Sequence, residues 1–440
     1  MGARFYSEKT TPALTKTLFG LSLPVVISAC GSMSGEPAAS ADPVTPQTVV
    51  EQYTTVAYTT YLDALTTAKA LNAATDKLIS NPTEENLEAA QAAWLASRVP
   101  YQQSEVFRFG NSVVDNWEGQ LNAWPLDEGL IDYVGSGDYQ YELGNEGATA
   151  NIIASREITI GGESVDVSTL TPALLADLNE IGGSEANVAT GYHAIEFLLW
   201  GQDHNGFEPG NGDRPASDYA KGDDCTHGHC DRRAEYLDAA TDLLASDLEW
   251  MVAQWAPSDS DNYRAELLAM DPQAALQKML FGMGSLSLGE LAGERMKVAL
   301  DANSFEDEHD CFSDNTHNSH YYNAVGIRNV YTGTYTRVNG TEVTGPSLSD
   351  LVSRQNPELD EQLRSDLKAS VEALGNMKRR AEASSDAMTF DMMIAPGNAE
   401  GATLVNNAIA ALVAQTASIE KASTMLGVAD LAPDDAGHSF

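Results

Sequence analysis

Hydrophobic residues recur at three- and four-residue steps over several long stretches of the chain, and this spacing predicts amphipathic helices. Thr83 is the expected cap of the second helix, with Glu85 in its first turn. Thr171 and Pro172 open a shorter one in the same way. We expect helices over residues 46–79, 83–109, 172–180, 183–201, 231–255, 272–300, 347–355, 357–384 and 399–426.

The segments between these helices show little strand pattern. Residues 202–228 form a long polar connection rich in Gly, Asp, Asn and Pro, and "TYTRVNGTEVTG" reads as a small polar hairpin. A chain of 440 residues is too long for one ordinary core. We therefore predict an all-α protein of two domains, each similar to a four-helix bundle, over residues 47–229 and 230–440.

The two predicted bundles share weak sequence similarity. "HAIEFLLWG" ends at Gly201 and "VGIRNVYTG" ends at Gly333, and aligning these glycines places Val325 opposite His193 and Arg328 opposite Glu196. We interpret this as a pseudo-duplication in which the second copy lacks the ionisable pair. A functional site is then expected in the first bundle or between the two.

The N-terminal residues have the pattern of a targeting segment rather than of a domain. A basic start is followed by the short apolar run "TLFGLSLPVVI" and by Cys30, which resembles the lipidation site of bacterial lipoproteins. We expect a signal peptide over residues 1–29 and a flexible Ser/Ala/Pro/Gly tether over 30–46. Gly31 follows the cysteine, and by resemblance to the sorting rule of Gram-negative lipoproteins this predicts the periplasmic face of the outer membrane.

Composition narrows the range of partners. The formal net charge is −39, which argues against binding to nucleic acid or to anionic lipid surfaces. So acidic a composition is typical of a very soluble protein, of a protein that works in a salty medium, or of one that binds a cation-rich partner.

"GYHAIEFLLWG" places two ionisable groups on an apolar helix. His193 and Glu196 are three residues apart and therefore share a helix face, and imidazole with carboxylate is a common ligand set for zinc and iron. A buried hydrogen-bonded couple is the other interpretation. Glu105 is the expected third ligand, because it lies on a polar stripe of the preceding helix. The same helix supplies Arg98, Tyr101 and Arg108 as residues that would orient the ligands.

Two further segments carry metal-capable groups. "CTHGHC" brings Cys225 and Cys230 close together in sequence, where a local disulfide and a zinc or copper site are alternatives. "EDEHDCFSDNTHNSH" covers residues 306–320 and includes Asp314 and His317 as candidate ligand-binding residues. A polar loop that caps helix ends is an equally good interpretation of that segment. Asp203 begins the long polar connection, which could gate the site.

These motifs together resemble one family. "GYHAIEFLLWG" is similar to the Gly-x-His-x-x-Glu motif of the imelysin family, also called M75 peptidase-like proteins, and the motif carries over onto Gly191, His193 and Glu196. "GDRPASDY", "CTHGHCDRR", "GELAGERM" and "WEGQLNAWPLDEGLIDYV" resemble its iron-regulated protein A branch. The resemblance implies an all-helical fold of two bundles with a site between them, and an envelope protein linked to iron uptake.

Three functional hypotheses follow. The first is an envelope lipoprotein that binds iron, zinc or another divalent metal, or a metal chelate, with iron favoured, and assists its uptake through an envelope uptake or redox partner. The second is a zinc-type metallopeptidase, which the family's peptidase label implies. The sequence offers little support for it, since it lacks a His-Glu-x-x-His motif. The third is a docking lipoprotein without catalytic activity.

Overall fold

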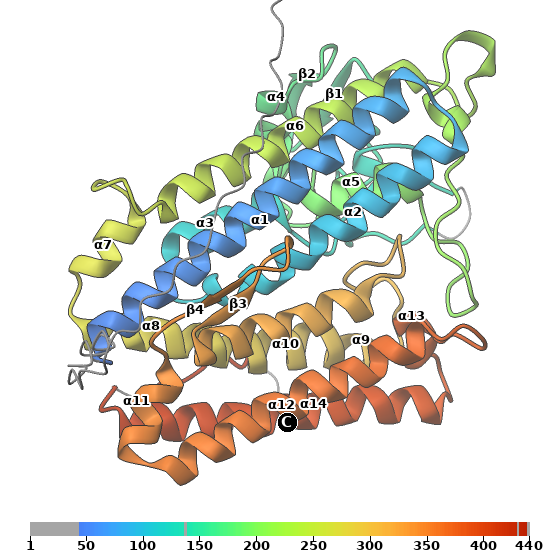
Figure 1. Ribbon diagram of the computed structural model, residues 1–440. Coiled ribbons are helices and arrows are strands. Elements are labelled where there is room, and N and C mark those ends of the chain that lie inside the picture. The colour runs from blue at the N-terminus through green and yellow to red at the C-terminus, as the bar shows by residue number, and fades with distance from the viewer. Residues whose placement is uncertain (1–43, 136–138, 429–430, 438–440) are drawn as a thin grey trace, which may run out of the picture. The chain divides into compact units, whose positions relative to one another are not determined.

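The computed structural model describes residues 44–135, 139–428 and 431–437, and Pro43–Phe440 form one compact unit. Regular structure in the described residues is almost entirely helical, which confirms the predicted all-α class (Figure 1). Its strands form two antiparallel hairpins, in which β1 (Glu157–Ile160) pairs with β2 (Glu163–Asp166) and β3 (Thr334–Thr336) pairs with β4 (Glu342–Thr344). The second hairpin lies where the sequence predicts one.

A first group of helices packs around α1 (Pro46–Ser80), which lies along α2 (Glu84–Ser104) and α6 (Cys230–Trp255). The short helix α5 (Gly191–Trp200) packs against both α2 and α6. Aromatic rings fill the centre of this group. Tyr61 stacks on Trp255 with ring centroids 6.3 Å apart, and Tyr53 meets Phe107 edge-on at 5.3 Å.

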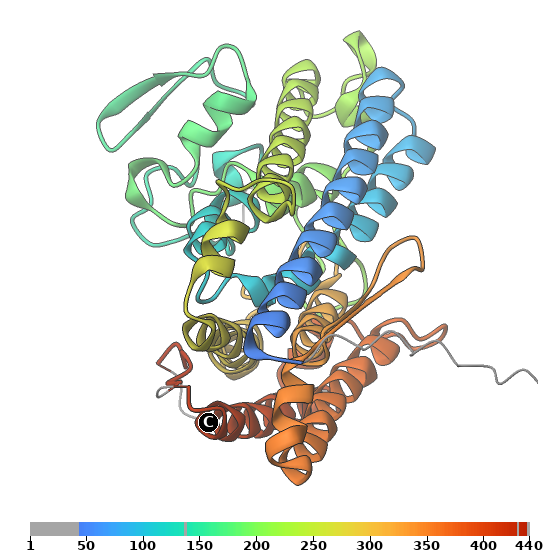
Figure 2. The same ribbon diagram turned by 60° about the vertical axis from the view of Figure 1, so that its left-hand side comes forward.

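A second group contains α8 (Pro272–Ser285), the π-helix η6 (Leu286–Val298), α10 (Thr316–Thr332), α12 (Pro357–Ala381) and α14 (Ala399–Met425). Here α12 packs on α10 and α14, and α14 packs on η6, so that they enclose a separate buried cluster that includes Leu291, Leu374 and Leu412. Because α10 also packs on α2, it joins the two groups (Figure 2).

Short elements connect the long helices. They are η1 (Glu105–Phe107), α3 (Ser112–Leu121), η2 (Glu128–Leu130), α4 (Pro172–Leu178), η3 (Ile181–Gly183), η4 (Ala216–Tyr219), η5 (Gly222–Asp224), α7 (Tyr263–Ala269), α9 (Ala299–Ala302), α11 (Leu348–Gln355) and α13 (Phe390–Ile394).

Three predicted helices differ clearly from the observed ones. The helix expected over 83–109 ends at Ser104, where the 3-10 turn η1 begins. The helix expected from residue 183 begins only at Gly191, because the preceding residues form a loop with Thr190 in extended backbone. The helix expected over 272–300 changes to π geometry at Leu286. Helix α14 is long and apolar enough to cross a membrane by length and composition alone, which is weak evidence, and residues such as Val405 and Leu412 on it are buried in the second cluster.

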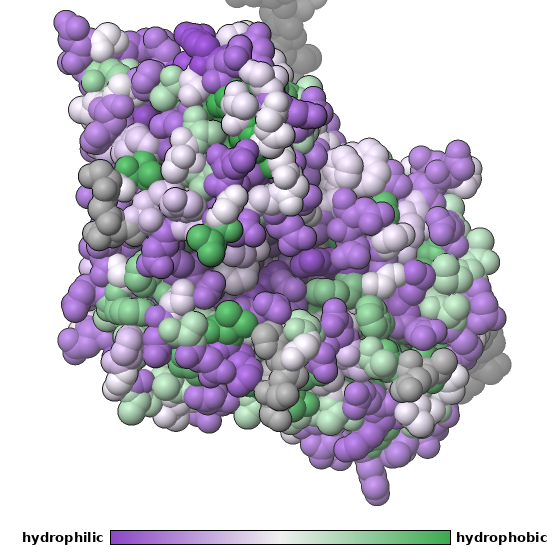
Figure 3. Space-filling model, turned by 180° about the vertical axis from the view of Figure 1, so that it is seen from behind, coloured by the Kyte–Doolittle hydropathy of each residue, from purple (hydrophilic) through white to green (hydrophobic). Residues whose placement is uncertain are grey.

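The predicted division at residue 229 stays a prediction, as does the pseudo-duplication. Helix α6 begins at Cys230, directly after the predicted boundary, and packs on helices of the first group. The signal peptide, Cys30 and nearly all of the tether lie outside the described residues. Hydrophilic residues predominate on the face shown in Figure 3, where hydrophobic residues form small scattered patches.

Candidate functional site

Helix α5 starts in close contact with the end of α3, and only glycine fits at the starting position. Gly191 has a φ of +79°, and a Cβ atom on it would lie 2.4 Å from the Leu121 carbonyl oxygen. Both observations exclude larger residues, because L side chains rarely adopt this backbone and a backbone oxygen cannot move aside. The contact fixes where α5 begins, and thereby where His193 and Glu196 are buried within it.

The His193 and Glu196 side chains bond to each other. Nδ1 of His193 lies 2.9 Å from Oε2 of Glu196, while the Ser313 amide and hydroxyl donate to Oε1 at 3.0 and 2.7 Å. Glu196 therefore has partners on both oxygens. Burial, and then the negative charge of Asp310, raise the pKa of Glu196 well above its ordinary value. The Glu196 carboxyl group thus contacts the imidazole of His193 at Nδ1.

Two residues from the loop before α10 complete a cluster around His193. The ring of His309 meets that of His193 edge-on with centroids 4.7 Å apart, and one potential ligand atom from each of His193, His309 and Asp310 lies within 4.8 Å of the others. Nε2 of His193 is buried and has no hydrogen-bond partner among the described residues. Burial, followed by the charge of Arg98, lowers the pKa of His193 to about 3, so the ring is neutral at pH 7.

Asp310 is the anchored anion of this His/Asp cluster. Its Oδ1 accepts from Arg98 Nη2 at 2.8 Å and lies 3.0 Å from His309 Nδ1, while Oδ2 accepts from Asn315 and Ser319. Burial alone would raise its pKa, but the Arg98 guanidinium and then the His309 ring hold the pKa well below its usual range. Arg98 is thus the positive charge that the cluster carries in the structure.

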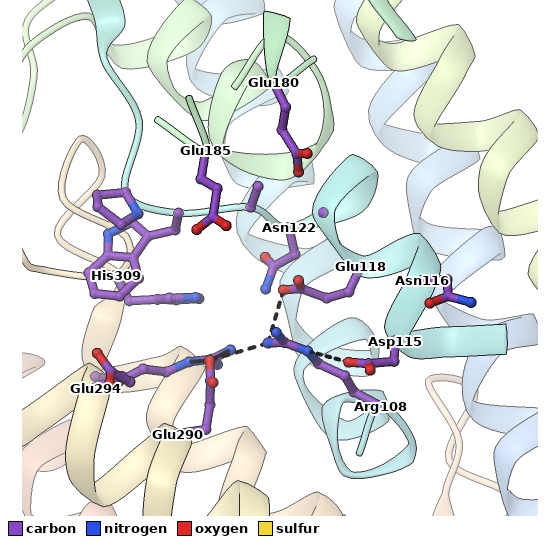
Figure 4. A pocket seen from close by; sticks show the side chains of 15 residues that line it. Arg108, Asp115, Asn116, Glu118, Asn122, Glu180, Glu185, Glu290, Glu294 and His309 are labelled. Carbon is purple, nitrogen blue, oxygen red and sulfur yellow. Dashed lines mark hydrogen bonds and ion pairs between the residues drawn. The ribbon is translucent and has the colours of Figure 1, made fainter. Parts of the chain in front are cut away.

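An acidic cavity of about 510 Å³ lies beside the cluster (Figure 4). Its wall includes His309 itself and Asn122, whose Oδ1 accepts from Arg98 Nη1 at 2.5 Å. Glu185 and Glu290 point into the cavity from opposite sides (Figure 4). The ionisable residues of the wall are Arg108, Asp115, Glu118, Glu180, Glu185, Glu290, Glu294, Arg295 and His309. The cavity therefore reaches the His/Asp cluster at His309, and carboxylates outnumber cationic groups in its lining.

The π-helix η6 shapes one wall of this cavity. Glu290 and Arg295 are five residues apart, which is the spacing of backbone hydrogen bonds in a π-helix, and Arg295 Nε donates to Glu290 Oε1 at 2.8 Å. Both line the cavity. Such π segments are rare and often occur at functional sites.

Glu105, the predicted third ligand, is paired with an arginine in the structure. It accepts from Arg295 Nη2 at 2.7 Å as a buried ion pair, and it is not among the groups placed to hold a metal with His193. The chain tightens from α-helix into the 3-10 turn η1 at Glu105, so the helical spacing from Arg98 no longer applies there. The groups within reach of His193 are instead His309 and Asp310.

The orienting residues of α2 have separate surroundings. Tyr101 packs on Tyr192 with ring centroids 4.6 Å apart, and the Arg98 guanidinium lies 5.0 Å from the Tyr192 ring. Arg108 forms ion pairs with Asp115 and Glu118 in the acidic cavity (Figure 4). Of the three, Arg98 alone contacts the His/Asp cluster.

The remaining predicted residues are spread over the surrounding loops. Asp203 accepts from the Asn205 amide at 2.8 Å, and His317 Nε2 lies 3.6 Å from a Glu382 carboxylate oxygen. Asp314 belongs to a separate group of carboxylates. Cys225 and Cys230 form a disulfide, with Cys311 free.

The sequence contained a signal for the two residues of the cluster that helical spacing did not select. His309 and Asp310 belong to "EDEHDCFSDNTHNSH", whose metal-capable groups stand out by composition. The segment is irregular around both residues, so no periodicity indicates which side chains turn towards α5. The composition of the segment indicates that it could bind a metal, but the three-dimensional structure is needed to identify His309 and Asp310 within it.

Comparisons with known proteins identify the family of the chain. The family model described as Imelysin, peptidase M75, matches residues 57–419. Iron-regulated protein A from Synechococcus elongatus is 24% identical over 372 residues, which cover 82% of this chain and 83% of that protein.

Solved structures show the same fold. The crystal structure of an iron-regulated protein A precursor from Parabacteroides distasonis matches with a TM-score of 0.61 and 19% identity over 88% of this chain and 97% of that one. An imelysin-like protein from Psychrobacter arcticum matches with a TM-score of 0.57 and 15% identity over 89% of this chain and 99% of that one. The chain belongs to the imelysin family.

Proposed function

We propose that this protein binds iron or another divalent metal, free or as a small chelate, at His193, His309 and Asp310, and assists its uptake. The observation that carries the proposal is Nε2 of His193. It is buried, it has no partner among the described residues, and its ring is held neutral beside a second imidazole and a carboxylate. Two imidazoles and one carboxylate form a set typical of iron and zinc sites.

Glu196 acts as a positioning residue in this proposal. Metal-binding histidines commonly donate their other ring nitrogen to a carboxylate, which fixes the ring and its tautomer. The contact between His193 Nδ1 and Glu196 has this form and leaves Nε2 for the metal. The predicted ligand pair of His193 and Glu196 thus becomes one ligand and its support.

The acidic cavity supplies the route of entry. Its carboxylates concentrate cations next to His309, whereas an anionic substrate would be repelled. Arg98 opposes the metal, because its charge already neutralises Asp310. The Arg98 charge therefore limits the affinity of the site for a cation. A site that must release its ion needs such a limit, so we expect the ion to be bound reversibly.

Metal titration of matched variants tests the proposal. We expect the full chain to bind one Fe²⁺ under anaerobic conditions, and Zn²⁺ at the same site, by calorimetry. His193→Gln should weaken both by at least tenfold, whereas His204→Gln, which changes an exposed histidine, should leave them unchanged. Equal binding by the two variants would refute the site and leave His193 and Glu196 as a structural hydrogen-bonded pair.

The proposal includes a location for this capture. A lipid on Cys30 would hold the protein at the periplasmic face of the outer membrane of a Gram-negative bacterium, next to an uptake or redox partner. The sequence pattern around Cys30 supports this. Cys30→Ser should move the protein from the membrane fraction to the soluble envelope fraction, and an unchanged membrane fraction would contradict the lipid anchor.

A further inference from the structure

A second group of acidic side chains lies beyond the His/Asp cluster. Glu308 and Asp314 come from the loop before α10, and Asp391 comes from α13. One carboxylate oxygen of each lies within 4.8 Å of the other two. Glu308 and Asp391 are each only 1% exposed, and Asp314 is 8% exposed. We call these three residues the carboxylate cluster.

Most oxygens of the carboxylate cluster lack a partner in the described part of the chain, in contrast to those of Asp310. Glu308 Oε1, Asp314 Oδ1 and both oxygens of Asp391 lack a hydrogen-bond partner among the described residues. Thr389 and the Met392 amide lie near enough to lower the pKa of Asp391, but neither meets hydrogen-bond geometry. A buried carboxylate without donors is costly, so some group must compensate it in the working protein.

The ion pairs of the described residues do not extend to this cluster. None of them includes Glu308, Asp314 or Asp391, whereas the buried Arg98 and Arg295 each have a carboxylate partner. Because one carboxylate oxygen of each residue lies within 4.8 Å of the other two, the three groups repel one another when ionised, and a multivalent cation would remove that repulsion.

We infer that Glu308, Asp314 and Asp391 hold a hard divalent cation of the calcium class, at a site separate from the proposed iron-binding cluster. A ligand set made only of oxygen favours Ca²⁺, Mn²⁺ or Mg²⁺ over the metals that prefer imidazole. Ca²⁺ fits best here, because it accepts irregular geometry and mixed carboxylate modes, whereas Mg²⁺ demands a near-ideal octahedron.

The position of this site gives the cation a structural task. Glu308 directly precedes His309, and Asp391 belongs to α13, which packs on α14 in the second helix group. A bound cation would tie the loop that carries His309 and Asp310 to that group. The inference goes beyond the proposed function, since it concerns a different ion and different ligands.

Calcium titration of the full chain tests the inference. We expect one Ca²⁺ per chain by calorimetry, and a higher melting temperature when Ca²⁺ is added. Asp391→Asn should lower Ca²⁺ affinity at least tenfold and abolish the Ca²⁺-dependent rise in melting temperature. Asp386→Asn, which changes an exposed carboxylate in the loop before α13, should behave as wild type. Without Ca²⁺, Asp391→Asn should melt no lower than wild type, because it removes repulsion.

Two outcomes would overturn the inference. One is the absence of saturable Ca²⁺ binding to wild type, which would mean that shared protons alone compensate the carboxylates. The other is equal Ca²⁺ affinity in Asp391→Asn and Asp386→Asn. The His193→Gln variant separates the two proposals, because it should retain Ca²⁺ binding while losing Fe²⁺ and Zn²⁺ binding.

Discussion

Arg98 offers the sharpest test of the electrostatics at the His/Asp cluster. Its guanidinium is 1% exposed, and its Nη2 donates to Asp310, which is fully buried. Replacing it with methionine keeps an unbranched apolar side chain but removes the charge, together with the guanidinium that lies over the Trp94 and Tyr192 rings. Asp310 then retains its contacts with Asn315 and Ser319 but has no cationic partner.

The expected cost is large. Removing one partner of a buried ion pair destabilises a protein by about 3–5 kcal/mol, because the other charge is left uncompensated. A metal ion bound at the cluster would take over the role of Arg98. Two unit charges 4 Å apart interact by about 4 kcal/mol at an effective dielectric constant of 20, so loss of the guanidinium should strengthen cation binding at least tenfold after relaxation.

Urea unfolding with and without Zn²⁺ measures both effects. A ligand at 100 times its Kd stabilises the folded state by about 2.7 kcal/mol, and tenfold tighter binding adds about 1.4 kcal/mol. Arg98→Met should therefore be less stable than wild type without metal and should recover part of the difference with Zn²⁺. Arg98→Lys retains the charge and should show no such extra gain. Equal or smaller stabilisation of Arg98→Met by Zn²⁺, relative to wild type, would refute the reasoning.

Three further changes test other parts of the structure. Gly191→Ala should cost about 2–4 kcal/mol of unfolding free energy, as expected for strain with a backbone clash, and should weaken Zn²⁺ binding; a variant of wild-type stability would disprove the tight contact with Leu121. Glu105→Gln should cost about 1–3 kcal/mol, since Glu290 still pairs with Arg295, yet leave metal affinity unchanged, whereas weaker metal binding would restore Glu105 as a ligand. Burial raises the pKa of Asp247 to about 6, so ionisation destabilises the folded state increasingly from pH 4 to 6 and fully above pH 6. Asp247→Asn should thus gain about 1–2 kcal/mol at pH 8, less than the full shift because the buried amide is also desolvated, and nothing near pH 4; unfolding curves with the same gain at both pH values would contradict this.

Local sequence signals were sufficient for α1 and α12. Thr45 caps α1 and Pro46 occupies its first turn, and the predicted range of 46–79 differs from the observed end by one residue. Asn356 and Pro357 define the start of α12 equally well. Periodicity over many residues averages out local exceptions, which is why these elements were predictable.

The elements around the site were harder to predict, because tertiary contacts decide them. The start of α5 depends on how closely Gly191 approaches Leu121, which involves residues 70 positions apart. The change to π geometry in η6 places Glu290 and Arg295 on one side, whereas an α-helical period of 3.6 residues would separate them. A single-sequence pattern carries neither piece of information.

Only the part of the candidate site that lies within one helix could be predicted from the sequence. His193 and Glu196 share a helix turn, so their spacing indicates a contact that the structure places at 2.9 Å. Glu105 begins a 3-10 turn, and His309 and Asp310 belong to the loop before α10, so helical spacing does not predict where these side chains point. The ligand hypothesis based on helical spacing therefore chose Glu105, whose partner is Arg295.

The charge of the acidic cavity also has a kinetic consequence. Six carboxylates and two guanidinium groups line it, so its field draws cations inwards from bulk solution before they contact any ligand. Counter-ions screen such a field beyond a Debye length of about 8 Å at physiological ionic strength. The association rate constant should therefore fall steeply with added salt, whereas the dissociation rate, set by buried groups at His193 and Asp310, should change little. The ionic strength of the medium would then set the rate at which the metal binds, and the buried ligands would set the rate at which it is released.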